Sequence, residues 1–224
     1  MKRTRACYIL GAAELKGWWP SPKDGDMILA ADAGWKHLRK LGWFADAAIG
    51  DFDTDAPPPQ GVRQTLCKAV IRLPVEKDDT DMAAAARIGL DGGCGAFYLL
   101  GGTGGRLDHT LANIQCLARL AKAGVSAYLM DAEQTLTALA GPSSIVFAEG
   151  SRGLVSVFAH DEIVEGATIS GLKYSLSGAR LYNTRALGVS NELTGGEASV
   201  SVARGTAVVV FPGTLLANLI RNEA

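Results

Sequence analysis

Short apolar runs alternate with amphipathic segments over residues 1–132. The apolar runs have the length of buried strands and lie at 7–10, 27–31, 47–49, 70–73, 96–100 and 125–130. The amphipathic segments carry apolar residues three or four positions apart and predict helices at 33–41, 80–90 and 110–123. Gly42 is the expected stop of the first helix. This alternation is typical of an α/β domain with a doubly wound parallel sheet, whose ligands bind at the carboxyl ends of the strands.

The pattern changes in the rest of the chain, where strand-like segments follow one another without helices. They lie at 135–139, 145–148, 154–159, 198–203 and 207–211, and the spaces between them are rich in Gly, Ser and Asn. We therefore predict a smaller all-β sandwich after the α/β domain. The expected domains are 1–132 and 133–224.

Composition and charge exclude several classes of protein. The 224-residue chain has 48% hydrophobic and 20% charged residues, which is ordinary for a globular protein and argues against intrinsic disorder. A net charge of −1 implies no basic surface, so we expect no nucleic-acid partner. No apolar stretch reaches the roughly 18 residues of a membrane span, so we expect no membrane partner.

The cysteines and the N-terminal residues bear on the compartment. The cysteines, at 7, 67, 94 and 116, form no C-x-x-C pair, which predicts neither a disulfide framework nor a zinc site. Basic residues at 2–5 and an apolar run at 6–13 imitate a short signal peptide. Because the run is short and passes straight into Glu14 and Lys16, we interpret it as a first buried strand and expect a cytoplasmic protein.

Aspartate is concentrated in the first half of the chain, where short carboxylates suggest cation chemistry. In the segment GDFDT at 50–54, Asp51 and Asp53 stand two positions apart after an apolar run, so both can point at one cation. The alternative is a polar turn. Asp32, at the end of the second apolar run, is either a further acid of this site or a helix cap.

The segment KDDTD at 77–81 opens a predicted helix. Asp78 or Asp79 is expected to cap this helix. Capping does not account for three acids beside a lysine, however. In the functional interpretation Asp81 joins the acids at 50–54 around Mg²⁺, and Lys77 faces anionic oxygens.

A glycine-rich segment, GGTGGRLDH at 101–109, joins a strand to a helix. Its backbone N–H groups and the helix N-terminus suit a phosphate, which Arg106 can hold with two hydrogen bonds. The segment is neither a Walker A loop nor a dinucleotide fingerprint. Asp108 has a helix cap as its alternative role, and His109 an ordinary surface position. The polar segment GVSNE at 188–192 has the composition of a turn.

Taken in chain order, these segments resemble the thiamine pyrophosphokinase (thiamine diphosphokinase) family. The matching segments are ADAG at 31–34, GDFDT at 50–54, KDDTD at 77–81, the glycine-rich segment at 101–109, GLKY at 171–174 and SNE at 190–192. They span most of the chain, and the combination is specific although each piece is short. The fold that the resemblance implies, an α/β catalytic domain followed by a β-sandwich, agrees with the division argued above.

The resemblance implies transfer of pyrophosphate from ATP to the hydroxyl of thiamine, giving thiamine diphosphate and AMP, with Mg²⁺ as cofactor and ATP as co-substrate. It also implies a homodimer whose site lies between the α/β domain of one subunit and the β domain of the other. By the matched positions, the implied catalytic residues are Asp51, Asp53, Asp81 and Asp108, of which the first three bind the metal. The implied ATP-binding residues are Asp32, Asp78, Thr80, Gly102, Thr103, Arg106 and His109, and the implied thiamine-binding residues are Lys77, Ser190 and Asn191.

The chain departs from the family pattern at two places. Ala33 stands where the family commonly has Gly. Where some relatives stack thiamine on a late-strand tryptophan, this chain reads VVVF at 208–211, which leaves Phe211 as the candidate. The acceptor is therefore less determined than ATP, and a pyrophosphokinase for another alcohol such as a pterin stays open.

Three other classes share part of these features. A nucleotide-sugar glycosyltransferase would leave the glycine-rich segment unexplained, and a haloacid-dehalogenase phosphatase needs Thr or Val where Asp55 stands. A non-catalytic sensor of a nucleotide or of thiamine diphosphate would not need the metal-binding acids. Because these acids are all present, we favour an enzyme.

Overall fold

The computed structural model describes residues 4–53, 56–58, 66–76 and 78–223. The chain separates into two compact units, Met1–Cys116 with Leu129–Asp131, and Leu117–Tyr128 with Ala132–Ala224. Lys77, which the sequence nominates for thiamine, lies outside the described residues.

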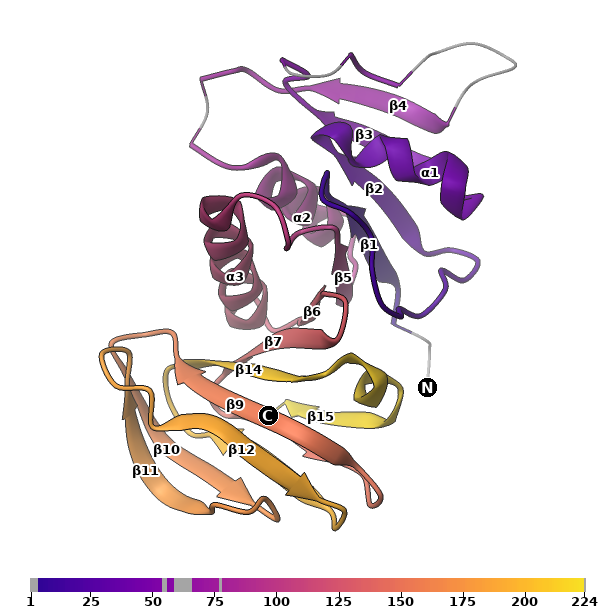
Figure 1. Ribbon diagram of the computed structural model, residues 1–224. Helices are drawn as coiled ribbons and strands as arrows, with labels where there is room; N and C mark the ends of the chain where they lie inside the picture. The colour runs from indigo at the N-terminus through magenta and orange to yellow at the C-terminus, as the bar shows by residue number, and fades with distance from the viewer. Residues whose placement is uncertain (1–3, 54–55, 59–65, 77, 224) are drawn as a thin grey trace. The chain divides into compact units, whose positions relative to one another are not determined.

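The first unit is built on a parallel sheet, as predicted (Figure 1). Its strands are β1 (Ala6–Leu10), β2 (Met27–Ala31), β3 (Ala45–Gly50), β4 (Cys67–Arg72) and β5 (Ala96–Leu100), and they lie side by side in the order β5-β1-β2-β3-β4. The chain continues through a further strand, β6 (Ser126–Met130). All five residues of β1 are buried, which explains why this strand is continuously apolar rather than alternating.

Helices join these strands. They are the 3₁₀-helix η1 (Asp32–Trp35), α1 (Lys36–Leu41), α2 (Asp81–Asp91) and α3 (Leu107–Lys122). The predicted helix at 33–41 is thus a 3₁₀ turn followed by an α-helix, which stops at Gly42 in the left-handed conformation as expected. Helix α2 packs on β1, β2 and β3 through a row of buried alanines, whose small side chains allow a close approach.

The strand order reverses direction at β1. The chain runs outward from β1 through β2 and β3 to β4, and then returns to place β5 on the other side of β1. The segments that follow β1 and β5 therefore lie beside each other: the N–H of Gly11 donates to the carbonyl of Leu100 (2.7 Å), and the N–H of Ala13 to the carbonyl of Gly101 (3.1 Å). Such a switch point is where doubly wound sheets bind ligands.

The second unit contains two antiparallel sheets, in agreement with the predicted all-β sandwich. One sheet has the order β12-β9-β14-β7 and the other β11-β10-β13-β8-β15. The elements are β7 (Gln134–Ala140), β8 (Ser143–Phe147), β9 (Arg152–Ala159), β10 (Ile163–Ser170), β11 (Leu176–Tyr182), β12 (Gly188–Thr194), β13 (Ala198–Val202), β14 (Thr206–Pro212), the 3₁₀-helix η2 (Gly213–Asn218) and β15 (Leu219–Glu223). The rings of Phe147 and Phe211, one from each sheet, meet edge to face with centroids 5.6 Å apart.

Four of these strands, β10, β11, β12 and β15, were not predicted. Their sequences carry glycine and polar residues, and β11 is mostly exposed, so they lack a clear apolar alternation. The interpretation of 188–192 as a turn is wrong, because these residues belong to β12. The pairing of β12 with β9 shifts register between Gly188 and Asn191, which breaks the alternation that identifies a strand.

No helix among the described residues combines the length and apolarity needed to cross a bilayer. The cysteines, at 7, 67, 94 and 116, are buried and form no disulfide, and all four belong to the first unit.

Candidate active site at the switch point of the parallel sheet

Three acidic side chains meet at the carboxyl ends of the strands. Asp32 follows β2, Asp51 follows β3, and Asp81 is the first residue of α2. One carboxylate oxygen from each lies within 4.8 Å of the others, and all three residues are partly buried. Neighbouring parallel strands end at the same edge of a sheet, which brings the first two together. We call these three residues the acid cluster.

The backbone of the acid cluster is strained. Asp32 and Phe52 have φ angles of 47° and 54°, in the left-handed region that non-glycine residues seldom occupy. Such conformations cost about 1–3 kcal/mol each and persist where the surrounding structure imposes them. Here Gly34 packs so closely on β1 that a Cβ atom would overlap the Leu10 carbonyl oxygen, which fixes the turn that carries Asp32.

The electrostatics of the acid cluster favour a bound cation. Burial raises the pKa of Asp32, and the negative charges of Asp81, Asp51 and Asp53 raise it further. Among the described residues, Oδ1 of Asp32 is buried without a hydrogen-bond partner. A divalent cation would pair with that oxygen and neutralise the repulsion, and hard carboxylate oxygens are ligands that Mg²⁺ accepts. The donor set therefore fits such an ion.

Asp53 lies beside the acid cluster rather than in it. It is exposed, and its N–H donates to Oδ1 of Asp51 at 3.3 Å. The described residues thus bring Asp32, Asp51 and Asp81 together, whereas the resemblance implies Asp51, Asp53 and Asp81. The implied metal role of Asp53 stays a prediction.

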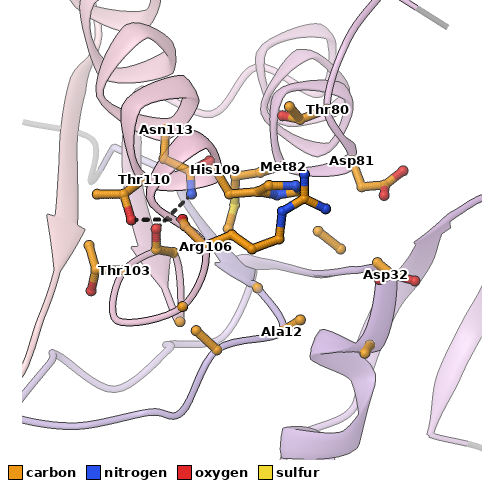
Figure 2. Close-up of a pocket in the computed structure, with 17 residues that line it drawn as sticks. Ala12, Asp32, Thr80, Asp81, Met82, Thr103, Arg106, His109, Thr110 and Asn113 are labelled. Atoms are coloured by element: carbon orange, nitrogen blue, oxygen red, sulfur yellow. Dashed lines mark hydrogen bonds between the residues drawn. The ribbon is translucent and has the colours of Figure 1, made fainter. Parts of the chain in front are cut away.

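A pocket of about 490 Å³ opens beside the acid cluster (Figure 2). This volume is in the range of small-molecule and cofactor sites. It is lined by the segments after β1, β2 and β5 and by the first turns of α2 and α3. Among the residues nominated by the sequence, its lining includes Asp32, Thr80, Asp81, Gly102, Thr103, Arg106 and His109.

Arg106 and Asp108 form a pair at the start of α3. The Nη2 and Nε atoms of Arg106 donate to the two carboxylate oxygens of Asp108 at 2.6 and 3.1 Å. This hydrogen bonding lowers the pKa of Asp108 to about 2. Because α3 begins at Leu107, Asp108 lies within the first helical turn and is not the N-cap that its alternative interpretation required. Arg106 lines the pocket, while His109 is an exposed lining residue.

The start of α2 differs from the prediction in one respect. The helix is capped by Thr80, whose Oγ1 accepts a hydrogen bond from the N–H of Ala83 at 3.2 Å, so the prediction of Asp78 or Asp79 as the cap is wrong. Asp79 instead pairs with Arg87, with Oδ2 3.5 Å from Nη1. Asp78 is exposed and lies outside the pocket lining, so its implied nucleotide role stays a prediction.

In the second unit, two of the segments that carry the resemblance meet, SNE at 190–192 and GLKY at 171–174. Asn191 is only 4% exposed; its Oδ1 accepts a hydrogen bond from the N–H of Tyr174 (3.0 Å), and its Nδ2 donates to the carbonyl of Tyr174 (2.6 Å). The neighbouring Ser190 is exposed, with a φ of 56°. Phe211 is fully buried against Phe147, so its ring is not available for stacking, whereas Tyr174 is 63% exposed.

One lining residue was missed by the sequence reasoning. Asn113 of α3 is 5% exposed and donates from Nδ2 to the carbonyl of Gly102 at 2.8 Å. A signal was available, because Asn113 stands four and seven positions before the buried Leu117 and Leu120, on the inward face of the helix. A polar residue at a core position usually has a specific partner.

An acid cluster suited to a divalent cation, beside a glycine-rich loop at a helix N-terminus and at the switch point of a doubly wound sheet, defines a nucleotide-phosphate-binding enzyme. Two family models match this chain: thiamin pyrophosphokinase, catalytic domain, at residues 21–129, and thiamin pyrophosphokinase, vitamin B1 binding domain, at residues 145–207. Together they match more than half of the chain. The chain therefore belongs to the thiamin pyrophosphokinase family, an enzyme family that transfers pyrophosphate.

Individual relatives agree. The chain is 26% identical over 182 residues to thiamine pyrophosphokinase of Bacillus subtilis (strain 168), covering 81% of this chain and 85% of the relative. Among solved structures, thiamin pyrophosphokinase from Geobacillus thermodenitrificans has a TM-score of 0.76 at 25% identity, covering 94% of this chain and all of that one. A thiamin pyrophosphokinase family protein from Enterococcus faecalis has a TM-score of 0.74 at 26% identity, covering 92% and 98%.

Proposed function

We propose that this chain transfers the pyrophosphoryl group of ATP to the hydroxyl of thiamine, giving thiamine diphosphate and AMP. The observation that carries the proposal is the convergence of Asp32, Asp51 and Asp81 beside the glycine-rich loop. The comparisons favour neither alternative, a pterin alcohol as acceptor or a non-catalytic sensor.

The reaction is a substitution at the β-phosphorus of ATP. The hydroxyl oxygen of thiamine bonds to this phosphorus, and the bond from the phosphorus to the oxygen that bridges to the α-phosphorus breaks. AMP leaves with the bridging oxygen, and the hydroxyl loses its proton to a base. Such reactions depend mainly on the positioning of the reactants and on the stabilisation of charge, and the residues of the pocket are suited to both.

The pocket residues divide these tasks. The acid cluster is suited to hold Mg²⁺, with Asp53 beside it, and Mg²⁺ when bound would neutralise charge on the phosphate oxygens. The loop N–H groups at 102–105 and the N-terminus of α3 face the nucleotide phosphates. Arg106, now held by Asp108, is placed to exchange that carboxylate for a phosphate, because both are recognised by two parallel hydrogen bonds.

We assign ATP and the metal to residues 1–132 and thiamine to residues 133–224. Family resemblance supports a homodimer in which the two parts of one site come from different subunits. Ser190 belongs to the thiamine side. The buried Asn191 stabilises this side through its two hydrogen bonds with the backbone of Tyr174. The four buried cysteines, which form no disulfide, fit a reducing compartment such as the cytoplasm.

The proposal is tested by incubating the purified protein with ATP, Mg²⁺ and thiamine and resolving the products by mass. Thiamine diphosphate with equimolar AMP is the expected result. Thiamine monophosphate with ADP would retain the ATP site and contradict attack at the β-phosphorus. Omitting Mg²⁺ in the presence of EDTA should stop product formation.

The acid cluster is tested by Asp51→Asn and Asp81→Asn. Each variant loses a charged oxygen ligand and should lose at least about a hundredfold in kcat/KM, on the order of 3 kcal/mol of transition-state stabilisation. Asp91→Asn, at the exposed end of α2, is the matched control and should keep full activity. Unchanged activity in both site variants would contradict the role of the acid cluster.

A further inference from the structure

The side chain of Asn113 is a polar group on the buried face of an amphipathic helix. It is 5% exposed and shares this face of α3 with Leu117 and Leu120, both fully buried. Burying an amide without partners costs several kilocalories per mole on transfer scales, so a buried amide needs hydrogen bonds that repay its desolvation. An apolar residue at the same position would avoid this desolvation cost, so the buried amide indicates a specific role.

The amide makes its contact with the glycine-rich loop. Nδ2 of Asn113 donates to the carbonyl of Gly102 at 2.8 Å, and Figure 2 shows this bond from α3 to the loop at the wall of the pocket. The approach is close, because a Cβ on Gly102 would lie 2.9 Å from Nδ2 of Asn113 and 2.7 Å from Cδ1 of Leu129. A side chain at position 102 would therefore press on the amide that reaches this carbonyl.

This contact determines where the N–H of Thr103 points. In a trans peptide the C=O and N–H of one unit point in opposite directions, so holding the Gly102 carbonyl on α3 turns the N–H of Thr103 away from the helix. Within the described part of the chain, the N–H groups of residues 102–105 donate to no protein atom. Free N–H groups beside a helix N-terminus form an anion site.

We infer that Asn113 is a positioning residue: it holds the Gly102–Thr103 peptide in the orientation in which the loop N–H groups receive the phosphates of ATP. The inference rests on the proposed function for the identity of the nucleotide. Asn113 acts through the loop. Without its side chain the Gly102–Thr103 peptide is free to rotate, which weakens the binding of phosphate while the fold is retained.

The test is calorimetric titration of ATP and, separately, of adenosine into wild type, Asn113→Ala and the control Gln115→Ala, an exposed amide on the same helix. Loss of one positioning hydrogen bond should weaken ATP binding of Asn113→Ala roughly tenfold. Adenosine affinity and the KM for thiamine should stay at wild-type values. Gln115→Ala should match wild type throughout, and Asn113→Gln, which keeps a donor, should recover part of the ATP affinity.

The outcomes separate this inference from the proposed function. Equal ATP affinity in Asn113→Ala and wild type would overturn the positioning role, and so would an equal loss for ATP and adenosine, which indicates general damage to the fold. If wild type itself binds no ATP, the proposed function fails instead. Should Asn113→Ala not fold, Asn113→Ser, whose shorter side chain does not reach Gly102, replaces it under the same criteria.

Discussion

At the scale of single residues, the acid cluster is a site where stability is given up for binding. Three carboxylates share a small volume, and burial together with the charges of its neighbours raises the pKa of Asp32. A raised pKa on an acid means that the folded state resists its ionisation. Without a cation, the ionised cluster therefore destabilises the fold at neutral pH.

Asp32→Asn should consequently stabilise the metal-free protein. The amide removes one buried negative charge, and Asn tolerates the left-handed backbone at this position. We expect Tm in EDTA at pH 7 to rise by roughly 2–4 °C, the shift that about 1 kcal/mol gives a chain of this size. The further rise that Mg²⁺ gives wild type should shrink in the variant. Asp91→Asn should alter neither value, and a lower Tm for Asp32→Asn would contradict the electrostatic argument.

The pair of Arg106 and Asp108 predicts a titration at low pH. Hydrogen bonds from Arg106 lower the pKa of Asp108 to about 2, below the ordinary value of 3.8. The pair thus contributes stability above pH 3.8, and loses it as the pH falls towards 2. NMR titration of the carboxyl carbon should give a midpoint near 2, and Arg106→Gln should raise it. The control Arg87→Gln removes the partner of Asp79 instead and should leave the midpoint of Asp108 unchanged. An unchanged midpoint in Arg106→Gln would contradict the presence of the pair in solution.

The sequence predicts some site residues better than others for a physical reason. Asp51 and Asp81 were predicted because each stands where a strand or helix begins or ends, which is visible in the sequence. Whether Asp32 or Asp53 joins them depends on the φ angles of Asp32 and Phe52, which no periodicity reveals. Close packing of Gly34 on β1 fixes the turn that carries Asp32.

At the scale of elements, the start of α2 carries both a cap and a site residue. Thr80 caps the helix and lines the pocket, and the next residue, Asp81, belongs to the acid cluster. The cap therefore fixes the helix end from which the acid projects. Disturbing it should change both stability and the position of the carboxylate.

Thr80→Ala should cost about 1 kcal/mol of unfolding free energy, because the N–H of Ala83 loses its acceptor. Thr80→Ser keeps the hydroxyl and should remain within a few tenths of wild type. Urea denaturation of both variants checks the prediction. Equal stability of the alanine and serine variants would show that the hydroxyl does not act as a cap.

Prediction of elements succeeded where the burial pattern is simple. Strands β1, β2 and β5 of the parallel sheet are continuously apolar, as is typical of strands covered on both faces, and the helices between the strands are amphipathic. Strands β11 and β12 escaped prediction because exposure, glycine and a register shift remove the alternation. Strand β12 also pairs with β9, with β10 and β11 between them in the chain, and a local pattern does not report such a pairing.

At the scale of the whole molecule, the chain forms two structural units, one built on the parallel sheet and one with two antiparallel sheets. The matched family models follow the same division of labour, one catalytic and one for vitamin B1. In the proposed homodimer the two parts of one site come from different chains, so one complete site needs two chains.

A complementation experiment tests this arrangement. Asp81→Asn and Ser190→Asn, which adds bulk on the thiamine side, should each be inactive alone. After subunit exchange, an equal mixture should recover about a quarter of wild-type activity, since half of randomly assorted dimers contain one intact site. Light scattering should give twice the 23.4 kDa chain mass. No recovery from mixed, dimeric samples would place each site within one chain.

The four buried thiols have a practical use in studies of folding. Cys7, Cys67, Cys94 and Cys116 lie in the first unit, and residues 117–224 contain no cysteine. A thiol reagent added to the unmodified protein reacts only when this unit opens, so the rate of labelling reports the rate at which it opens. Residues 117–224 have no thiol and give no signal. Peptide mapping of the label then distinguishes opening near β1, β4 or α3, and the natural chain serves as its own reporter.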